Sequence, residues 1–394
     1  MPITALVPSE TSSIGSDDGP KALRILFAVD SNFPGFGGAE KQALKLARAL
    51  RTQGIHVEFV SPQVDPEQAL EEQVDGFSVT RIAYPKIPKF GALILMVLFR
   101  RYLINNAHRY DAVHVHITHL LAAAAGFARS QSQLPVITKI SGYFEFEGGV
   151  LDQNQRFKPV NFIVRRGLRK VDHVQTISVQ TRQKLLGAGF RESQIVFIPN
   201  GIELCEHPTP PPGDDRLVLG YCGRLREVKG VHILFQSIAR LKELCADQAL
   251  EVSIAGNGEA RADLLALAEK LKIADQVRWL GRIEETSNFF RSLDIYVQPS
   301  FAEGLPNSVM EAMAEQRPVI ASDIGGNSDL IDDNISGLLF PVGDASTLAQ
   351  QILRLVDDPQ LRNSIAIRGR ENIASGYAMD QVISLLVEVY SGRN

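Results

Sequence analysis

Short apolar, β-branched runs alternate with amphipathic stretches from residue 23 to about residue 199. A run at 23–29 is followed by a helical pattern over 38–51 and a second apolar run at 56–60. Further β-rich runs occupy 112–117, 135–140, 173–178 and 194–199. Because strands that alternate with helices pair in parallel, this pattern predicts an α/β domain over residues 21–204.

The alternation stops at 208–215, where a Pro-rich polar segment is typical of an interdomain linker, which we place at 205–215. It then resumes, with β-rich runs at 217–222, 251–255, 277–280, 295–297 and 318–322. A second α/β domain is therefore predicted over 216–375. We expect two Rossmann-like α/β domains facing a central cleft. Residues 1–20 are rich in Ser, Thr, Asp, Gly and Pro, which predicts a disordered N-terminal tail.

The composition suits two domains of ordinary size. Of the 394 residues, 45% are hydrophobic and 22% are charged, which is enough for two separate cores. Cys205, Cys222 and Cys245 show no metal-ligand spacing, so neither a disulfide framework nor a zinc site is predicted. The longest apolar run, 92–99, is too short to cross a bilayer, and residues 1–20 lack an apolar signal core. We expect a cytoplasmic protein.

Charge is distributed unevenly along the chain. The net charge of −4 combines +8 over residues 21–204, −9 over 205–394 and −3 over 1–20. Two segments of the first domain contain basic residues and no acidic ones. They are 76–110, with Arg81, Lys86, Lys89, Arg100, Arg101 and Arg109, and 156–170, with Arg156, Lys158, Arg165, Arg166, Arg169 and Lys170. We expect these segments to dock on an anionic membrane surface; a core helix with a solvated basic face is the alternative.

Two carboxylates come from one strand–loop–helix segment. The buried strand predicted at 294–300 is followed by Glu303 in a Gly/Pro loop, and Gly304 and Pro306 open a helix that contains Glu311. Open α/β sheets bind ligands past the carboxyl ends of their strands, and the first amides of a helix suit an anion. The segment therefore suits phosphate together with sugar hydroxyls, while a solvated acidic helix face is the alternative.

The spacing of Glu303 and Glu311, with seven residues between them, resembles the motif of the retaining GT-B glycosyltransferases, and the chain is similar to glycosyltransferase family 4. The resemblance implies that the first Glu lies by the donor sugar and that the second binds the nucleotide ribose. It also implies a final helix, over about 376–394, that crosses back to the first domain. The turn 198–201 fits either the family's hinge turn or an ordinary turn. Donor-binding candidates between the two carboxylates are Gly304, Leu305, Pro306 and Asn307.

A basic pair follows the first strand of the second domain. Gly223 and Arg224 come directly after that strand, and Lys229 lies five residues beyond Arg224. An arginine fork and a lysine point charge can hold a diphosphate from two sides. As an isolated pair they would be ordinary surface cations, but in the resembled family the corresponding residues stabilise the departing diphosphate. Glu303, Arg224 and Lys229 are therefore the expected catalytic residues, and Gly223 is a donor-binding candidate.

Glycine-rich turns follow several other strands. The turn 35–40 lets the backbone approach a ligand, although alone it is a weak signal and it is not a GxGxxG motif. In the resembled family a similar turn lies near the donor phosphates and the acceptor, which makes site candidates of Gly37, Gly38 and Glu40. The family places the nucleotide base and ribose at strand ends that correspond here to Gly256, Gly281 and Arg282.

Three histidines, His114, His116 and His119, cluster at the end of one predicted strand. No carboxylate or cysteine lies at ligand spacing, so a contact with a sugar or acceptor is favoured over a metal site. Ser141 and Gly142 follow the next strand, where many members of the resembled family have His-Gly, so no positioning histidine is implied there. These five residues and Glu40 are the acceptor-side candidates.

No Asp-x-Asp triplet, the divalent-cation clamp of the other glycosyltransferase fold, occurs in the chain, and no P-loop, HExxH or Ser/His/Asp elbow is present. The resemblance implies a retaining hexosyltransferase that needs no metal or other cofactor. It would move a sugar from a UDP- or GDP-sugar to a glycan or lipid-linked acceptor in cell-surface polysaccharide or glycolipid biosynthesis, with no nucleic acid as partner. The alternatives are a GT-B epimerase or phosphorylase, and a non-catalytic nucleotide-sugar-binding protein.

Overall fold

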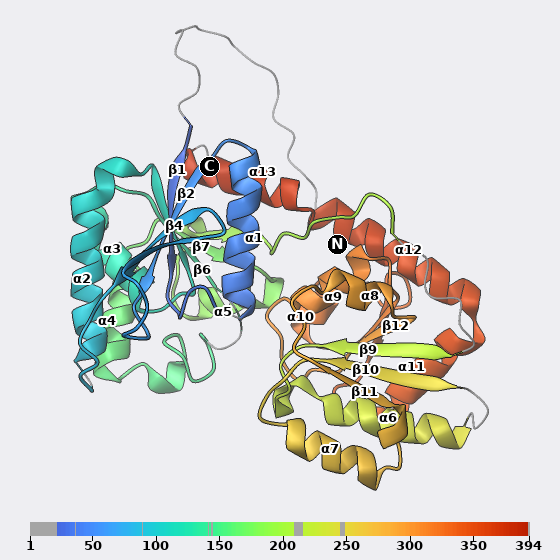
Figure 1. Ribbon diagram of the computed structural model, residues 1–394. Coiled ribbons are helices and arrows are strands. Elements are labelled where there is room, and N and C mark those ends of the chain that lie inside the picture. Colours follow the sequence, from blue (N-terminus) through green and yellow to red (C-terminus); the bar gives the residue numbers. More distant parts are fainter. Residues whose placement is uncertain are drawn as a thin grey trace, which may run out of the picture.

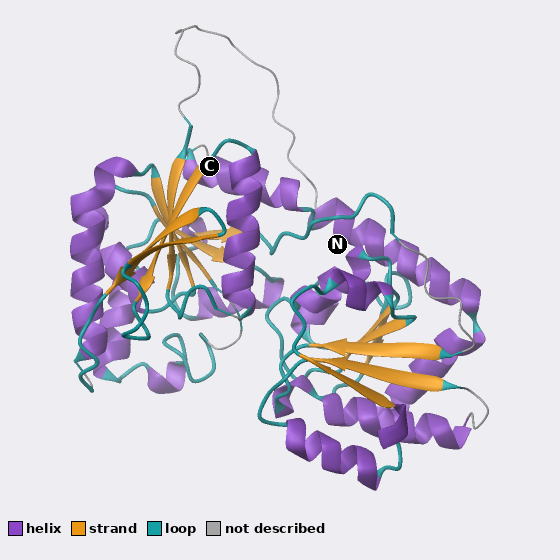
Figure 2. Cartoon of the chain, viewed as in Figure 1, coloured by secondary structure: helices purple, strands orange, loops and turns teal. Residues whose placement is uncertain are grey.

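The computed structural model confirms the fold class: two α/β domains, each built on a mainly parallel sheet with helices on both faces (Figures 1 and 2). It describes residues 22–392 except 36, 89, 141, 143–144, 209–215 and 245–248. The predicted tail at 1–20 and most of the linker at 205–215 therefore lie outside the described residues, as do Ser141, Lys89 and Cys245.

An eight-stranded sheet forms the first domain, in the order β3-β4-β2-β1-β5-β6-β7-β8. Its strands are β1 (Arg24–Val29), β2 (His56–Pro62), β3 (Glu71–Val74), β4 (Phe77–Ile82), β5 (Ala112–His116), β6 (Val136–Lys139), β7 (His173–Thr176) and β8 (Ile195–Phe197). Its helices are α1 (Gly38–Thr52), α2 (Gly91–Asn106), α3 (Leu120–Ser132), α4 (Pro159–Leu168) and α5 (Val179–Gly187), joined by the C-terminal α13 (Met379–Tyr390).

Different helices cover the two faces of this sheet. Leu26 and Ala28 of β1 pack with α2, α3 and α4, whereas Phe27 of the same strand packs with α1 and α13. The split follows from the period of two along a strand. The apolar run 92–99 lies within α2, and Phe99 is fully buried against that first core. The core-helix interpretation is therefore correct for the apolar side of this run.

One edge strand is antiparallel, which the alternation of strands and helices did not predict. β3 pairs with β4 across the two-residue turn Asp75-Gly76, and both turn residues have positive φ, 54° and 75°. Such a turn matches the twist of a hairpin and favours Asp-Gly. That dipeptide was the available sequence signal, because the strand before it, Glu-Glu-Gln-Val, is too polar to stand out.

The second domain has a six-stranded sheet in the order β11-β10-β9-β12-β13-β14. Its strands are β9 (Leu217–Cys222), β10 (Leu250–Ala255), β11 (Val277–Gly281), β12 (Ile295–Gln298), β13 (Val319–Ser322) and β14 (Leu338–Phe340). Its helices are α6 (Val231–Leu244), α7 (Arg261–Lys270), α8 (Ser287–Arg291), α9 (Asn307–Ala314), α10 (Gly325–Ser328), α11 (Ala345–Asp357) and α12 (Pro359–Gly376). One core packs against α6, α7 and α11, and the other against α8, α9 and α12.

The chain returns to the first domain beside the place where it leaves it. The N–H of Ile202 donates to the Tyr377 carbonyl, and the N–H of Met379 donates to the Ile202 carbonyl, both at 2.9 Å. A Cβ on Gly201 would lie 2.6 Å from the Met379 Sδ, so a larger residue here would have to displace the Met379 side chain. Beyond it, α12 packs along the second domain and α13 along α1 of the first (Figure 1).

The carboxyl ends of both sheets meet at the boundary between the domains. A Cβ added to Gly304, after β12, would come within 2.9 Å of the Cα of Gly142, which follows β6. The N–H of Val179, at the start of α5, donates to Asp329 of the other domain at 2.8 Å. Strand order reverses between β1 and β5 in one sheet and between β9 and β12 in the other. Both reversals, where such sheets bind ligands, therefore lie at this boundary.

Candidate active site

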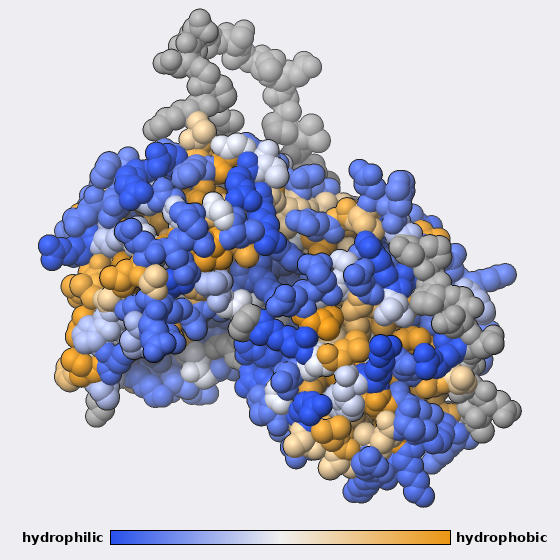
Figure 3. Space-filling view, viewed as in Figure 1, coloured by the Kyte–Doolittle hydropathy of each residue, from blue (hydrophilic) through white to orange (hydrophobic). Residues whose placement is uncertain are grey.

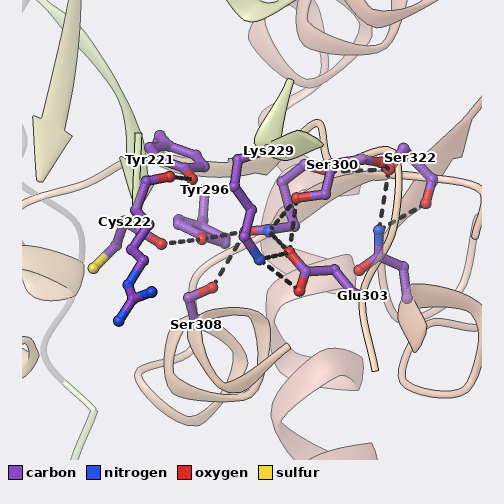
Figure 4. Close-up of polar contacts among 11 residues, drawn as sticks. Tyr221, Cys222, Lys229, Tyr296, Ser300, Glu303, Ser308 and Ser322 are labelled. Atoms are coloured by element: carbon purple, nitrogen blue, oxygen red, sulfur yellow. Dashed lines mark hydrogen bonds and ion pairs between the residues drawn. The ribbon is translucent and has the colours of Figure 1, made fainter. Parts of the chain in front are cut away.

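Glu303 lies just past the carboxyl end of β12 and is held by several donors. Its Oε1 accepts from Gln298 Nε2, Ser300 Oγ and Lys229 Nζ, each at 2.7 Å, and its Oε2 accepts from Lys229 Nζ at 2.8 Å. Figure 4 shows Lys229 and Glu303 pointing toward one another. The Gln298 amide is itself fixed by the Tyr296 hydroxyl, at 2.6 Å. A carboxylate fixed in this way can stabilise positive charge without rearranging.

Lys229 reaches Glu303 from the turn between β9 and α6. That turn is a short 3₁₀ helix that ends at Gly230, whose φ is 67°. A Cβ on Gly230 would lie 2.0 Å from the Pro299 carbonyl oxygen, so glycine allows the turn to approach the loop after β12. Arg224, earlier in the same turn, is exposed, and its guanidinium has no ion-pair or hydrogen-bond partner among the described residues. Loops after two neighbouring strands thus bring together two cations and one carboxylate.

Glu311 lies one turn inside α9 and is bound by the other domain. Lys45 Nζ, on α1, donates to Glu311 Oε1 at 2.8 Å, and the two side chains are 30% and 16% exposed. Asn307, the first residue of α9, accepts hydrogen bonds from Asn200 at 2.8 Å and from Gln42 at 3.1 Å. The first domain therefore holds the N-terminal half of α9 by three side chains.

The N-terminus of α9 also faces the glycine turn after β1. Its N-cap residue is Pro306, and no side chain caps the helix. A Cβ on Gly38 would lie 3.5 Å from the Asn307 amide nitrogen. The Glu40 carboxylate folds back over Gly37, where it occupies the space that a side chain at Gly37 would need. The turn and the positive end of the helix dipole thus lie opposite each other, which is an arrangement that suits an anion.

Three glycine turns of the second domain lie together. A Cβ on Gly256 would lie 1.8 Å from the Gly223 carbonyl oxygen, and the Gly256 N–H donates to the Gly281 carbonyl at 2.7 Å. No atom of the described residues lies within 4 Å of the place where a Cβ on Gly281 would be, and Arg282 next to it is exposed. Leu305, by contrast, is buried in the apolar core with α9, so its side chain packs and does not line the site.

Family models match both domains of this site. Residues 37–201 match the model described as glycosyl transferase 4-like domain, and residues 206–372 match that of glycosyl transferases group 1. The chain joins a 4-like domain to a group 1 domain. Glu303, Glu311, Arg224 and Lys229 all belong to the group 1 domain, whereas Lys45 belongs to the 4-like domain.

Relatives and solved structures agree with this assignment. The chain is 29% identical over 182 residues to the lipopolysaccharide core biosynthesis glycosyltransferase LpsE of Rhizobium meliloti (strain 1021), covering 46% of this chain and 52% of LpsE. It is 25% identical over 383 residues to D-inositol 3-phosphate glycosyltransferase 1 of Catenulispora acidiphila, covering 90% of each. The chain thus spans about half the length of some relatives and most of others.

Among solved structures, HepE of Anabaena in complex with UDP superposes with a TM-score of 0.75 at 20% identity, covering 94% of this chain and 100% of that one. A likeness at this identity shows the fold, which is GT-B. It extends over both the 4-like domain and the group 1 domain.

In the 4-like domain, burial corrects two acceptor-side assignments. His114 and His116 are 0% and 1% exposed, and their rings stack with centroids 4.4 Å apart. His114 Nδ1 lies 2.7 Å from the hydroxyl of Tyr390, on α13. Both histidines are inaccessible to solvent, and for that reason neither is placed to contact an acceptor directly. His119 alone of the three is accessible: its side chain is 46% exposed, and Nδ1 lies 3.7 Å from the Asp30 carboxylate.

Sequence reasoning missed the residues that hold the two carboxylates. Gln298 and Ser300 stand at the end of a predicted strand, and polar side chains there, next to Glu303, were a usable signal. Lys45 has no such signal, because it lies 266 positions from Glu311 on a helix of the 4-like domain. Only the packing of the two domains brings that pair together.

Among the described residues, no group of three or more His, Cys, Asp and Glu side chains is placed to hold a metal ion. Glu303 and Glu311 each contact a lysine instead.

Proposed function

We propose that this chain is a retaining glycosyltransferase that moves a sugar from a nucleotide-sugar to a glycan or lipid-linked acceptor, in the synthesis of lipopolysaccharide or another cell-surface glycan. The supporting observation is the Glu303–Lys229 pair, with Arg224 in the same loop as Lys229, at the strand-order reversal of the group 1 domain. Ligands of open α/β sheets bind at that position, and two cations beside one carboxylate match the charges of a sugar diphosphate.

In the proposed reaction, the bond between the anomeric carbon and the diphosphate oxygen breaks, and its electron pair leaves with the diphosphate. Arg224 and Lys229 stabilise that negative charge, while Glu303 stabilises the positive charge on the anomeric carbon. The acceptor oxygen forms the new bond on the same face of the sugar, and its proton passes to an oxygen of the departing diphosphate. Glu311 accepts hydrogen bonds from the ribose, and the two cations make a metal ion unnecessary.

UDP is the nucleotide that we favour for the donor. HepE of Anabaena, which shares the GT-B fold, was solved with UDP and with UDP-glucose. The turn at Gly281 leaves open space where a nucleoside would lie, and Gly256 packs between this turn and Gly223, the residue before Arg224. Relatives named for lipopolysaccharide core and for inositol 3-phosphate favour a glycan or a polyol as the acceptor.

Thermal-shift screening against UDP- and GDP-sugars, followed by turnover assays with and without acceptor, tests this proposal. We expect one donor to raise the melting temperature and nucleoside diphosphate to be released only with an acceptor. NMR of the product should show the anomeric configuration of the donor, and an inverted product would refute retention. Epimerised donor without acceptor would indicate an epimerase, sugar 1-phosphate would indicate a phosphorylase, and binding without turnover would indicate a binding protein.

Fewer basic residues are available to meet a membrane than the sequence suggested. Arg81 is almost fully buried and paired with Glu72, so it is not a surface cation, and Arg109 pairs with Glu58. Arg165 donates to backbone carbonyls of the loop before α4. Among the described residues of the two basic segments, Arg101, Arg166 and Arg169 are exposed and make no side-chain ion pair or hydrogen bond, while the exposed Lys158 donates only to the side chain of Gln155, at 2.9 Å. None of the helices that the structure describes is both long and apolar enough to cross a bilayer.

Large apolar side chains are exposed among these cations. Phe157 and Phe162, at the start of α4, are 82% and 62% exposed, and Phe90 and Val97 of the α2 segment are 62% and 64% exposed. α3 packs between α2 and α4, so all four lie on one helical layer. Figure 3 shows apolar residues at the outer edge of the first domain, where α2 lies. We propose that this layer docks on an anionic leaflet that carries the acceptor.

Co-sedimentation with anionic and neutral liposomes at low and high salt tests the docking. The chain should pellet with anionic vesicles at low salt, because exposed cations are screened as salt rises. Replacing Phe157 and Phe162 by serine should abolish pelleting, whereas Leu265→Ser, at an exposed position of the second domain, should not. Equal pelleting with neutral vesicles, or none in any condition, would contradict the docking.

A further inference from the structure

Lys139 is a buried lysine at the carboxyl end of β6. Its Cα pairs with His116 of β5 and with Gln175 of β7, so the three side chains share the face of the sheet that α1 and α13 cover. The lysine is 6% exposed, and both of these neighbours are essentially inaccessible to solvent. Most of the ammonium's surroundings are therefore protein.

Lys139 has no counter-ion among the residues that the structure describes. Among the described residues, no carboxylate forms an ion pair with its Nζ, and no side chain or carbonyl accepts a hydrogen bond from it. Burial lowers the pKa of Lys139 to about 8. Burial also lowers the pKa of His114, to about 3, and that of His116, and the charge of Lys139 acts in the same direction on both. Neutral histidines on the neighbouring strand therefore lie beside a cation that has no counter-ion among the described residues.

The position of Lys139 places this cation near the site. Three residues further along the chain, Gly142 lies against Gly304, the residue after Glu303. β6 thus ends at the part of the domain boundary where the first domain touches the loop that holds Glu303. Arg224 and Lys229, which we assign to the donor diphosphate, come from the opposite side of that boundary. Lys139 belongs to the side that faces the acceptor.

We propose that Lys139 binds an oxyanion carried by the acceptor, a phosphate or a carboxylate close to the hydroxyl that receives the sugar. That the anion belongs to an acceptor rests on the proposed function; the existence of an anion site at Lys139 does not. A desolvated ammonium is costly unless an opposite charge pairs with it, and an oxyanion would supply that charge together with a hydrogen-bond acceptor. The subsite would make an anionic acceptor bind in preference to its neutral counterpart.

Thermal shift with inorganic phosphate, in the presence of saturating UDP and at constant ionic strength, tests the subsite. UDP occupies the diphosphate position, so any further rise in melting temperature reports a second anion site. We expect the wild-type chain and Lys139→Arg to respond to phosphate. Lys139→Met should bind phosphate at least about tenfold more weakly, since a charge-assisted hydrogen bond is lost. Lys170→Met, at an exposed lysine of the same domain that contacts the Phe127 ring, should respond like the wild type.

The melting temperature of ligand-free Lys139→Met gives a second readout. Methionine of similar length removes an uncompensated buried charge, so this variant should melt at the same temperature as the wild type or higher. A lower melting temperature would overturn the proposal, because it would show that Lys139 is paired within the protein. So would an unchanged phosphate response in Lys139→Met, or no response in the wild type. A phosphate response without any response to UDP would instead overturn the proposed function and leave the anion site standing.

Discussion

Replacing Glu303 by glutamine removes the negative charge at the centre of the candidate site, and the structure shows that it also disturbs a hydrogen-bond network. Lys229 Nζ lies 2.7 and 2.8 Å from the two carboxylate oxygens. Either orientation of the new amide therefore places an NH₂ group against the ammonium. The less damaging orientation keeps the amide oxygen at the position of Oε1, where it still accepts from Gln298, Ser300 and Lys229, so that only the second contact of Lys229, with Oε2, is lost together with the charge.

The size of both effects can be estimated from this geometry. A hydrogen bond to a charged group is worth about 1.5–3 kcal/mol, and Lys229, whose side chain is 24% exposed, can turn toward water, so we expect Glu303→Gln to lose about 1–3 kcal/mol of stability. For a domain of this size, each kcal/mol lowers the melting temperature by about 2–4 °C. Loss of one preorganised electrostatic group should lower turnover by about 10²-fold or more.

Glu315→Gln is the matched control. Its side chain is 9% exposed against 10% for Glu303, and Arg291 holds it with Nε at 2.9 Å and Nη2 at 3.2 Å, at the other end of α9. This variant should lose comparable stability and keep turnover within about twofold. Adding Lys229→Met to Glu303→Gln should restore part of the melting temperature, because it removes the ammonium that faces the NH₂ group of the new amide. It should not restore turnover, because Lys229 is also a catalytic cation.

Thermal melts and steady-state turnover, measured on the same preparations, separate the two roles of Glu303. Turnover of folded Glu303→Gln within about threefold of wild type would remove Glu303 from the mechanism. An unchanged melting temperature in Glu303→Gln would show that the contacts with Lys229 contribute nothing to the fold. Equal losses of turnover in the Glu303 and Glu315 variants would mean that lost stability, and not lost chemistry, explains the effect.

Four further outcomes are expected. EDTA should leave activity within about twofold, and strict dependence on added Mg²⁺ would contradict the scheme. Arg224→Ala should cost about 2–4 kcal/mol of transition-state stabilisation, measured from the change in kcat/KM. Lys45→Met should tighten UDP binding about two- to fivefold in calorimetry, because a partly exposed ion pair worth about 0.2–1 kcal/mol no longer competes for Glu311; weaker binding would refute that competition. Gly304→Ala should lower kcat about tenfold or more with little change in melting temperature, because its Cβ would press on Gly142 across the domain boundary; unchanged kcat would show that the boundary adapts.

Most of the parallel strands were predictable from the sequence because they are buried and largely apolar. The parallel strand β4, whose residues alternate between buried and less buried, and the three-residue strand β14 were not predicted. The run 217–222 is β9 without any change of bounds, and 23–29 exceeds β1 by one residue. The edge strand β3 was missed because its sequence, Glu-Glu-Gln-Val, is polar and lacks the apolar run by which the buried strands were identified. Its one signal was the Asp75-Gly76 turn.

Within the candidate site, the residues that follow strand ends were predictable. A parallel sheet carries all its carboxyl ends to one edge, so Arg224, Lys229 and Glu303 had to lie near one another once β9 and β12 were neighbours. His114 and His116 show where this reasoning fails. Alternation places them on one face of β5, but the helix that covers that face, α13, comes from 276 positions further along the chain.

The amino-acid sequence by itself thus determined where strands end and which charged residues follow them, because hydrophobic period and turn residues act over a few positions. Only the tertiary structure decided which of those charges meet. Lys45 pairs with Glu311, and Lys139 is buried with no counter-ion among the described residues, because of how two domains and a returning helix pack. Such contacts depend on the position of whole elements in space, and residues hundreds of positions apart leave no local pattern that relates them.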